Sequence, residues 1–222
     1  MSTPPRRVAV FDLDDTLVRG DSFALFMRHL LFRQRWRAAL AVLSAPVLWP
    51  MLFVPASRRI AIGGMLWIAS AGLSEAEFTG LARRFATAHA DRRIRPALDR
   101  LRQHLDAGDR VVIVTACADP LASAVCAELG LPDVEIIAAR LQHGRAGMRP
   151  ALGCRGAQKV DRLRDAGISL PVDYAYTDSA VDLPLLKVAT HRYLIEPSTR
   201  HRDRIRAVLP DNVTVLDTTT TP

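Results

Sequence analysis

Acidic residues gather near the amino end of the chain, in the segment Asp12-Leu13-Asp14-Asp15-Thr16. They directly follow a short apolar run, and in open parallel sheets ligands bind at the carboxyl ends of the strands. Two carboxylates this close repel each other unless a cation lies between them or they take separate acid and base roles. A calcium-binding loop is excluded, because its Gly and Glu positions would be Leu17 and Phe23 here.

Later polar residues complete a set that could transfer a phosphoryl group. Thr115 follows a second apolar run, Lys159 opens an expected helix, and Asp178 follows a third run, with Asp182 at the start of the next helix. Together with Asp12 they supply a nucleophilic carboxylate, a hydroxyl donor, an ammonium group and further acids for a metal. This inventory fits phosphoryl transfer through a covalent acyl-phosphate.

The elements that would position these residues can be read from the apolar pattern. Continuous apolar runs of this length are typical of strands buried on both faces. They predict strands at Val8–Leu13, Arg110–Val114, Val134–Ala138, Val172–Tyr176 and Arg192–Ile195, with helices at Pro120–Leu129 and Gln158–Ala166. Each of these helices is followed by a glycine, the usual stop signal. The alternation predicts an α/β fold with a doubly wound, mostly parallel sheet.

The segment 21–95 interrupts this alternation, since it contains no convincing strand. Ser74 followed by Glu77 forms a capping box that opens a helix, and Pro96 stands where the first turn of the next helix would begin. We therefore expect a catalytic core made of residues 1–20 and 96–222, with an α-helical cap, residues 21–95, inserted after the first strand.

Within the cap, the segment 38–73 is unusually apolar. Ala38–Ser57 contains no charged residue and is long enough to be a candidate membrane span, whereas Ile60–Leu73 is too short. If the residues on both sides of the cap build one site, a single crossing is excluded, because both must lie on the same side of the membrane. Pro46, Pro50 and Pro55 would also kink a straight helix. The remaining options are a shallow or re-entrant membrane hairpin, or a cap packed on itself.

Composition limits the partners and the compartment. The 222 residues include 30 Lys and Arg against 23 Asp and Glu, a net charge of +7 that favours an anionic partner. No zinc finger, RNA-binding aromatic pair or base-reading helix is present, so we expect no nucleic acid partner.

The three cysteines lack CxxC spacing, which argues against a disulfide framework or a zinc site. Val8–Phe11 is too short for a signal peptide's apolar region, so we expect a cytoplasmic catalytic part.

The ordered set described above resembles the haloacid dehalogenase superfamily of phosphatases, and the resemblance covers residues 7 to about 195. It implies a Rossmann-like core and a phosphoric monoester hydrolase that works through an aspartyl-phosphate. Asp12 would be the nucleophile, and Asp14 would protonate the leaving oxygen and then activate water. Thr115 and Lys159 would bind the phosphoryl oxygens of the substrate.

The resemblance also implies a Mg²⁺ ion. Its ligands would be the side chains of Asp12 and Asp178 and the backbone carbonyl of Asp14. Asp182 would not touch the ion but would hold these ligands in position. The sequence departs from the family pattern at Asp15 and Thr177, where glycine is usual or frequent. Asp15 would add negative charge beside the phosphate or else point outward.

The helical insertion resembles the phosphoserine-phosphatase-like branch of this superfamily, in which a Glu that contacts the substrate amine stands where Asp21 stands here. Beyond that position it is similar to the phosphatidylglycerophosphatase C family of bacterial membranes, in segments such as Asp21-Ser22-Phe23, Arg58-Arg59 and Cys154-Arg155-Gly156. This likeness implies a lipid phosphate substrate such as phosphatidylglycerol phosphate, a role in phospholipid metabolism, and association with the cytoplasmic face of the inner membrane.

Two alternatives stay open. The first is a soluble cytoplasmic phosphomonoesterase of the phosphoserine phosphatase type, which keeps the chemistry and changes the substrate. The second is a catalytically impaired Mg²⁺-binding module that serves a membrane or a partner, motivated by Asp15.

Overall fold

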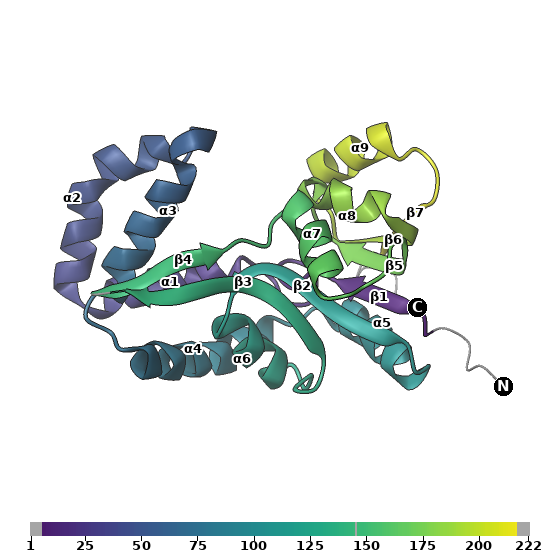
Figure 1. The fold of residues 1–222 in the computed structure, drawn as a ribbon, viewed down its shortest axis with the longest axis horizontal. Coiled ribbons are helices and arrows are strands. Elements are labelled where there is room, and N and C mark those ends of the chain that lie inside the picture. Colours follow the sequence, from purple (N-terminus) through teal and green to yellow (C-terminus); the bar gives the residue numbers. More distant parts are fainter. Residues whose placement is uncertain (1–5, 145, 217–222) are drawn as a thin grey trace.

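The computed structural model describes residues 6–144 and 146–216, in which one sheet runs through the molecule (Figure 1). Its strand order is β4-β3-β2-β1-β5-β6-β7, and every pairing is parallel except that of β3 with β4. The strands are β1 (Val8–Phe11), β2 (Arg110–Ala118), β3 (Glu135–Gly144), β4 (Gly147–Leu152), β5 (Val172–Thr177), β6 (Ala189–Ile195) and β7 (Val213–Leu216). The predicted α/β class with a mostly parallel sheet is confirmed.

Helices cover both faces of the sheet, as the continuous apolar runs predict. The core helices are α5 (Arg95–Asp106), α6 (Leu121–Glu128), α7 (Ala157–Asp165), α8 (Leu183–Lys187) and α9 (Thr199–Val208). On β1, Phe11 belongs to a buried cluster with Leu98 of α5 and Leu121 of α6. Val10 points the other way, into a second cluster that includes Leu163 of α7 and Ile205 of α9. Alternate residues of the central strand thus anchor opposite layers.

Further helices follow β1 before the chain returns to the sheet: α1 (Ser22–Arg33), α2 (Arg35–Met51), α3 (Pro55–Ser70), α4 (Glu75–His89) and a 3₁₀ turn at Ala90–Arg92. The capping box of Ser74 and Glu77 opens α4 as predicted. Pro96 lies in the first turn of α5, which also agrees with the sequence pattern. The division into a core and a cap with the boundaries given above stays a prediction.

Helices α2 and α3 form a hairpin that stands apart from the sheet layers (Figure 1). The apolar run is broken at residues 52–54, between the two helices. The hairpin is fixed to the β3–β4 arm, since the Met148 N–H donates to Ser70 Oγ at 2.8 Å and the Gly72 N–H donates to the Ala146 carbonyl at 3.0 Å. Among the described residues, no helix combines the length and the apolar content that crossing a bilayer requires.

The β3–β4 arm and β7 were not predicted. The sequence pattern ends the third strand at Ala138, whereas β3 continues to Gly144 and turns back into β4. The reason is that Arg140, Gln142 and Arg149 interrupt the apolar pattern of this arm, in which Met148 joins a buried cluster without forming part of an apolar run. An apolar signal is therefore absent where the strand is not buried.

Candidate active site

Strand register brings the candidate residues to one edge of the sheet. Phe11 of β1 pairs with Ile113 of β2 and with Tyr176 of β5, so Asp12 follows at the carboxyl ends of the three central strands. Thr115 lies two residues beyond Ile113 on one side. The Asp12 N–H donates to the Tyr176 carbonyl at 3.0 Å, which fixes the start of the acidic loop to β5.

Lys159, from the first turn of α7, ties together residues from distant parts of the chain. Its Nζ donates to Asp12 Oδ1 at 2.8 Å and to Asp182 Oδ2 at 2.6 Å, and all three side chains are buried. Burial alone lowers the pKa of this ammonium, but the two carboxylates raise it above its ordinary value, so the group stays charged. Thr177 Oγ1 donates to the same Asp182 oxygen at 2.9 Å, which orients that carboxylate from behind.

The side chain of Asp14 turns toward the start of α1. Its Oδ1 accepts from the Ser22 N–H at 3.0 Å and from the Ser22 hydroxyl. Ser22 Oγ is also 2.9 Å from His89 Nε2. Since the single hydroxyl hydrogen of Ser22 goes to Asp14, His89 Nε2 must donate to Ser22. Burial raises the pKa of Asp14 to about 7, and the hydrogen bonds from Ser22 oppose the rise.

Asp15 and Asp21 both use their carboxylates to hold local backbone. Asp15 has φ of 55°, the left-handed conformation in which glycine is freest, and this explains the glycine usual at its position in the family. Its Oδ1 accepts from the Gly20 N–H at 2.6 Å, so the carboxylate is engaged with the loop. Asp21 is the N-cap of α1, accepting from the Ala24 N–H at 2.8 Å. Its expected role toward a substrate stays a prediction.

Asp178 and Thr115 complete the set that the sequence pattern predicted. Burial raises the pKa of Asp178 to about 7, and the negative charges of Asp12 and Asp15 add to the rise. Thr115 is fully buried, and its Oγ1 accepts from the Cys117 N–H at 3.0 Å. Within the described residues, no three His, Cys, Asp or Glu side chains are grouped so that they could hold a metal ion by themselves.

Ser22, His89 and Thr177 were not identified as site residues from the sequence. Thr177 stands beside Asp178 and could have been found by that position. Ser22 begins the helix that Asp21 caps, but only its hydrogen bonds connect it to Asp14. His89 is buried and lies 67 residues from Ser22 along the chain. No local pattern reveals a contact of that range.

Comparisons with known proteins show the family and the fold of the chain. A family model described as haloacid dehalogenase-like hydrolase matches residues 9–187. Phosphoserine phosphatase SerB1 of Mycobacterium tuberculosis is 30% identical over 207 residues, covering 89% of this chain and 67% of the relative. A protein of unknown function from Bordetella pertussis Tohama I is similar in structure, with a TM-score of 0.70 and 24% identity over 94% of this chain and 98% of that one. A phosphoserine phosphatase solved as a phospho-aspartyl intermediate analogue has a TM-score of 0.56 at 12% identity, covering 95% of this chain and 93% of that one.

Proposed function

The chain belongs to the haloacid dehalogenase-like hydrolase family, and on this premise we propose that it is a phosphatase of small phosphomonoesters that works through an aspartyl-phosphate at Asp12. One observation carries the proposal. Lys159 places its ammonium between Asp12 at the end of β1 and Asp182 beside β5, at 2.8 and 2.6 Å. A buried cation held there by two carboxylates is suited to a phosphoryl group that meets Asp12.

In the first half of the reaction, an oxygen of Asp12 attacks phosphorus and the bond from phosphorus to the leaving oxygen breaks. Asp14 gives its proton to that oxygen, so the product leaves as a neutral alcohol. A carboxyl group whose pKa lies at about 7 is suited to this role, because both of its protonation states are populated near neutral pH. Ser22 holds Asp14 through two hydrogen bonds.

In the second half, Asp14 takes a proton from a water molecule that attacks the phosphorus of the aspartyl-phosphate. The bond between Asp12 and phosphorus breaks, which releases inorganic phosphate and restores both carboxyl groups. Thr115 and Lys159 hold the phosphoryl oxygens through both steps, and Asp182 and Thr177 keep Lys159 in place. The reaction therefore needs no co-reactant other than water.

The donor set fits a divalent cation. Asp12 and Asp178 offer carboxylate oxygens and Asp14 offers its backbone carbonyl, and oxygen ligands of this kind suit Mg²⁺. Burial and the charges of Asp12 and Asp15 raise the pKa of Asp178, so a cation would relieve a repulsion that the side chains present leave uncompensated. When bound, Mg²⁺ supplies positive charge that neutralises the phosphoryl oxygens.

The similarity to a phosphoserine phosphatase favours a small phosphomonoester over the lipid phosphate expected from the sequence pattern. The match to a hydrolase family favours an active enzyme over the impaired Mg²⁺-binding module. The test is phosphate release from phosphoserine, p-nitrophenyl phosphate, lysophosphatidic acid and phosphatidylglycerol phosphate, with and without Mg²⁺. We expect Mg²⁺-dependent turnover with phosphoserine preferred. Turnover that is higher on both lipid substrates would overturn the substrate class, and no turnover on any would overturn the function.

A lipid phosphate stays the second candidate because of one feature of the hairpin. Of the sixteen exposed large apolar side chains among the described residues, twelve lie between Phe32 and Trp67. Leu43, Trp49 and Phe53 are 76, 61 and 75% exposed. Residues 22–74 contain six arginines and no Asp or Glu. An exposed apolar surface with purely cationic flanks is complementary to an anionic lipid surface.

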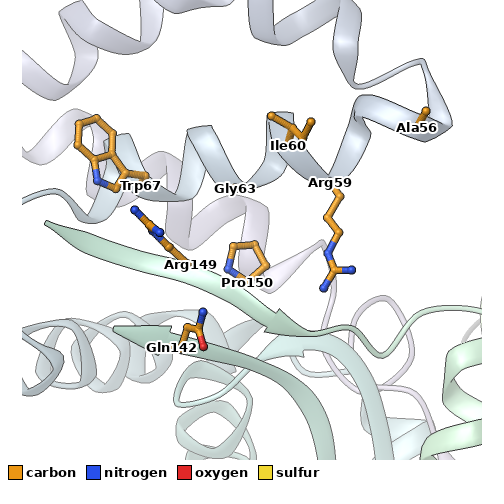
Figure 2. Close-up of a pocket in the computed structure, with 8 residues that line it drawn as sticks. All are labelled: Ala56, Arg59, Ile60, Gly63, Trp67, Gln142, Arg149 and Pro150. Atoms are coloured by element: carbon orange, nitrogen blue, oxygen red, sulfur yellow. The ribbon is translucent and has the colours of Figure 1, made fainter. Parts of the chain in front are cut away.

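A cavity at the base of the hairpin supports the same candidate. It has a volume of about 530 Å³ and lies between α3 and the β3–β4 arm, where Figure 2 shows Arg59, Trp67, Gln142, Arg149 and Pro150 around it. Two guanidinium groups and an amide beside an apolar wall suit a phosphate that carries an apolar tail. If this candidate is correct, turnover of phosphatidylglycerol phosphate in vesicles exceeds that of phosphoserine and falls in Arg59→Ala/Arg149→Ala.

A further inference from the structure

A second cavity lies between α1 and α4, and its wall is cationic and aromatic. It has a volume of about 550 Å³. The side chains that give it its character are Arg28, His29, Arg33, Phe85, His89 and Arg92. No Asp or Glu is among the residues that line it. The chemistry of this wall is that of a site for an anion.

Among the described residues, the three arginines of this cavity form no ion pair; Glu77 of α4 interacts with Arg33 through its charge alone. Across residues 6–144 and 146–216, the side chains of Arg28, Arg33 and Arg92 form no hydrogen bond and no ion pair. Guanidinium groups that share one cavity repel each other, so their arrangement gains stability when an anion is present. The segment 22–74 supplies no acid that could take this place.

The aromatic part of the wall is organised by Phe85. Its ring stacks on His89, with centroids 5.2 Å apart and planes 23° apart, and the ring of His29 lies 5.9 Å from it on α1. Flat rings beside guanidinium groups accept an apolar or aromatic portion next to a charged one. The cavity thus suits an organic anion better than a bare inorganic ion.

His89 connects this cavity to the active site. One of its ring nitrogens, Nε2, donates to Ser22, and Ser22 donates to Asp14 through both its N–H and its hydroxyl. The chain of hydrogen bonds therefore runs from a residue that lines the cavity to the carboxyl group assigned as acid and base. His89 is the last residue of α4, whereas Ser22 is the first of α1, so the link also joins two helices that bound the cavity.

We propose that the cavity between α1 and α4 binds a phosphorylated or carboxylated organic anion, and that His89 and Ser22 couple its occupancy to Asp14. The coupling rests on the proposed function, whereas the binding does not. Two sources offer this chemistry: the leaving portion of the substrate itself, if that portion carries a second anionic group, and a separate small molecule.

Binding is tested with methylenediphosphonate, whose P–C–P linkage a phosphatase cannot hydrolyse, followed by the imidazole ¹⁵N–¹H resonances of the chain without Mg²⁺. We expect those of His29 and His89 to shift and saturate, whereas those of His191 and His201 stay in place. In Arg28→Ala/Arg33→Ala the midpoint should rise about tenfold or more, since two charge-assisted contacts are lost. The matched control Arg200→Ala/Arg206→Ala removes the same charge from exposed positions of α9 and should keep the wild-type midpoint.

An absent shift of His29 and His89, or equal midpoints in the two double variants, would overturn the binding. These results do not depend on turnover. A chain that binds the diphosphonate but hydrolyses no phosphomonoester overturns the proposed function alone.

Kinetics then tests the coupling and separates the two sources. If the cavity holds part of the substrate, Arg28→Ala/Arg33→Ala raises KM for phosphoserine more than KM for p-nitrophenyl phosphate, which lacks a second anionic group. If it holds a separate molecule, methylenediphosphonate changes kcat for p-nitrophenyl phosphate in the wild-type chain and has less effect in that variant. If a chain that binds the diphosphonate and is active shows neither of these two results, the coupling is overturned.

Discussion

The carboxyl end of the sheet and the α2–α3 hairpin place their side chains in opposite ways. At the sheet, charged groups are buried and paired, as Lys159 is between Asp12 and Asp182. In the hairpin, large apolar groups such as Leu43 and Phe53 face outward without partners among the described residues. Burying charge costs folding free energy, and leaving apolar surface exposed forgoes the gain that burial would bring, so each arrangement points to something the region does beyond folding.

The two regions also differ in whether other parts of the chain compensate for this unfavourable arrangement of their side chains. At the sheet, ionic contacts from distant segments compensate one another, and the strand register maintains them. In the hairpin nothing in the described chain covers the apolar face. The comparison predicts that substitutions at the sheet end affect both activity and stability, whereas substitutions in the hairpin leave stability almost unchanged.

The largest effect is expected for Asp12→Asn. An amide cannot act as the nucleophile, so turnover of p-nitrophenyl phosphate should fall by roughly 10⁴-fold or more, which initial rates would measure. Far-ultraviolet circular dichroism should remain that of the wild-type chain. A rate within tenfold of wild type would show that the buried charges at the sheet end serve stability rather than catalysis.

Removing the buried cation should have the largest effect on stability. Lys159→Met leaves the carboxylates of Asp12 and Asp182 without a partner, and we expect a loss of about 3–5 kcal/mol in the free energy of unfolding. Lys187→Met is the matched control, because Lys187 is the other lysine of the chain and is exposed. Urea unfolding measures the free energy of unfolding of both variants. Equal stability of the two variants would contradict a stabilising role for the ion pairs of Lys159 with Asp12 and Asp182.

A pH-dependent effect is expected at Asp109, which directly precedes β2 at the amino end of the strands, opposite the active site. Burial raises the pKa of Asp109, but hydrogen bonds from His104 and Arg7 more than offset this, and the net pKa is lower than usual. A lowered pKa means that the carboxylate stabilises the fold above its unfolded pKa and loses this contribution as the pH falls through the folded one. Asp109→Asn should therefore cost about 1.5–3 kcal/mol at pH 7 and less as the pH falls through the lowered pKa of Asp109.

Chemical unfolding of the wild-type chain and of Asp109→Asn across this pH range measures that difference. A cost that does not depend on pH would mean that the side chain acts through packing alone. That outcome would show that the charge of this buried carboxylate, at the opposite end of the sheet, does not stabilise the fold.

The smallest effect on stability is expected in the hairpin. Trp49→Ser should change the free energy of unfolding by less than about 0.5 kcal/mol, because the side chain is mostly exposed. If the apolar face contacts lipid, the same variant should bind phosphatidylglycerol vesicles about threefold or more weakly in cosedimentation, since part of a large apolar side chain no longer inserts. Equal binding by the variant, or strong binding to zwitterionic vesicles, would argue against an anionic lipid surface.

The sequence predicted the sheet end better than the rest because its signals are local. Asp12 and Asp178 directly follow apolar strands, and parallel pairing then brings the strand ends together. The β3–β4 arm was missed because Arg149 and Pro150 give it no apolar run. The contact of Ser22 with His89 depends on how α1 and α4 pack, which no spacing in the sequence encodes. The apolar hairpin was recognised as one option, but the position of its break at residues 52–54 was not predicted, and α2 continues through Pro46 and Pro50.

The central claim is that Asp12 becomes covalently phosphorylated during turnover. The direct measurement is acid quenching of the enzyme with Mg²⁺ and phosphoserine, followed by borohydride reduction and peptide mass spectrometry. Borohydride converts an aspartyl-phosphate to homoserine, so the mechanism predicts homoserine at position 12 in the wild-type chain only when substrate is present. Active enzyme that yields no modified residue under quenching, or homoserine at position 14 or 178 instead, would contradict it.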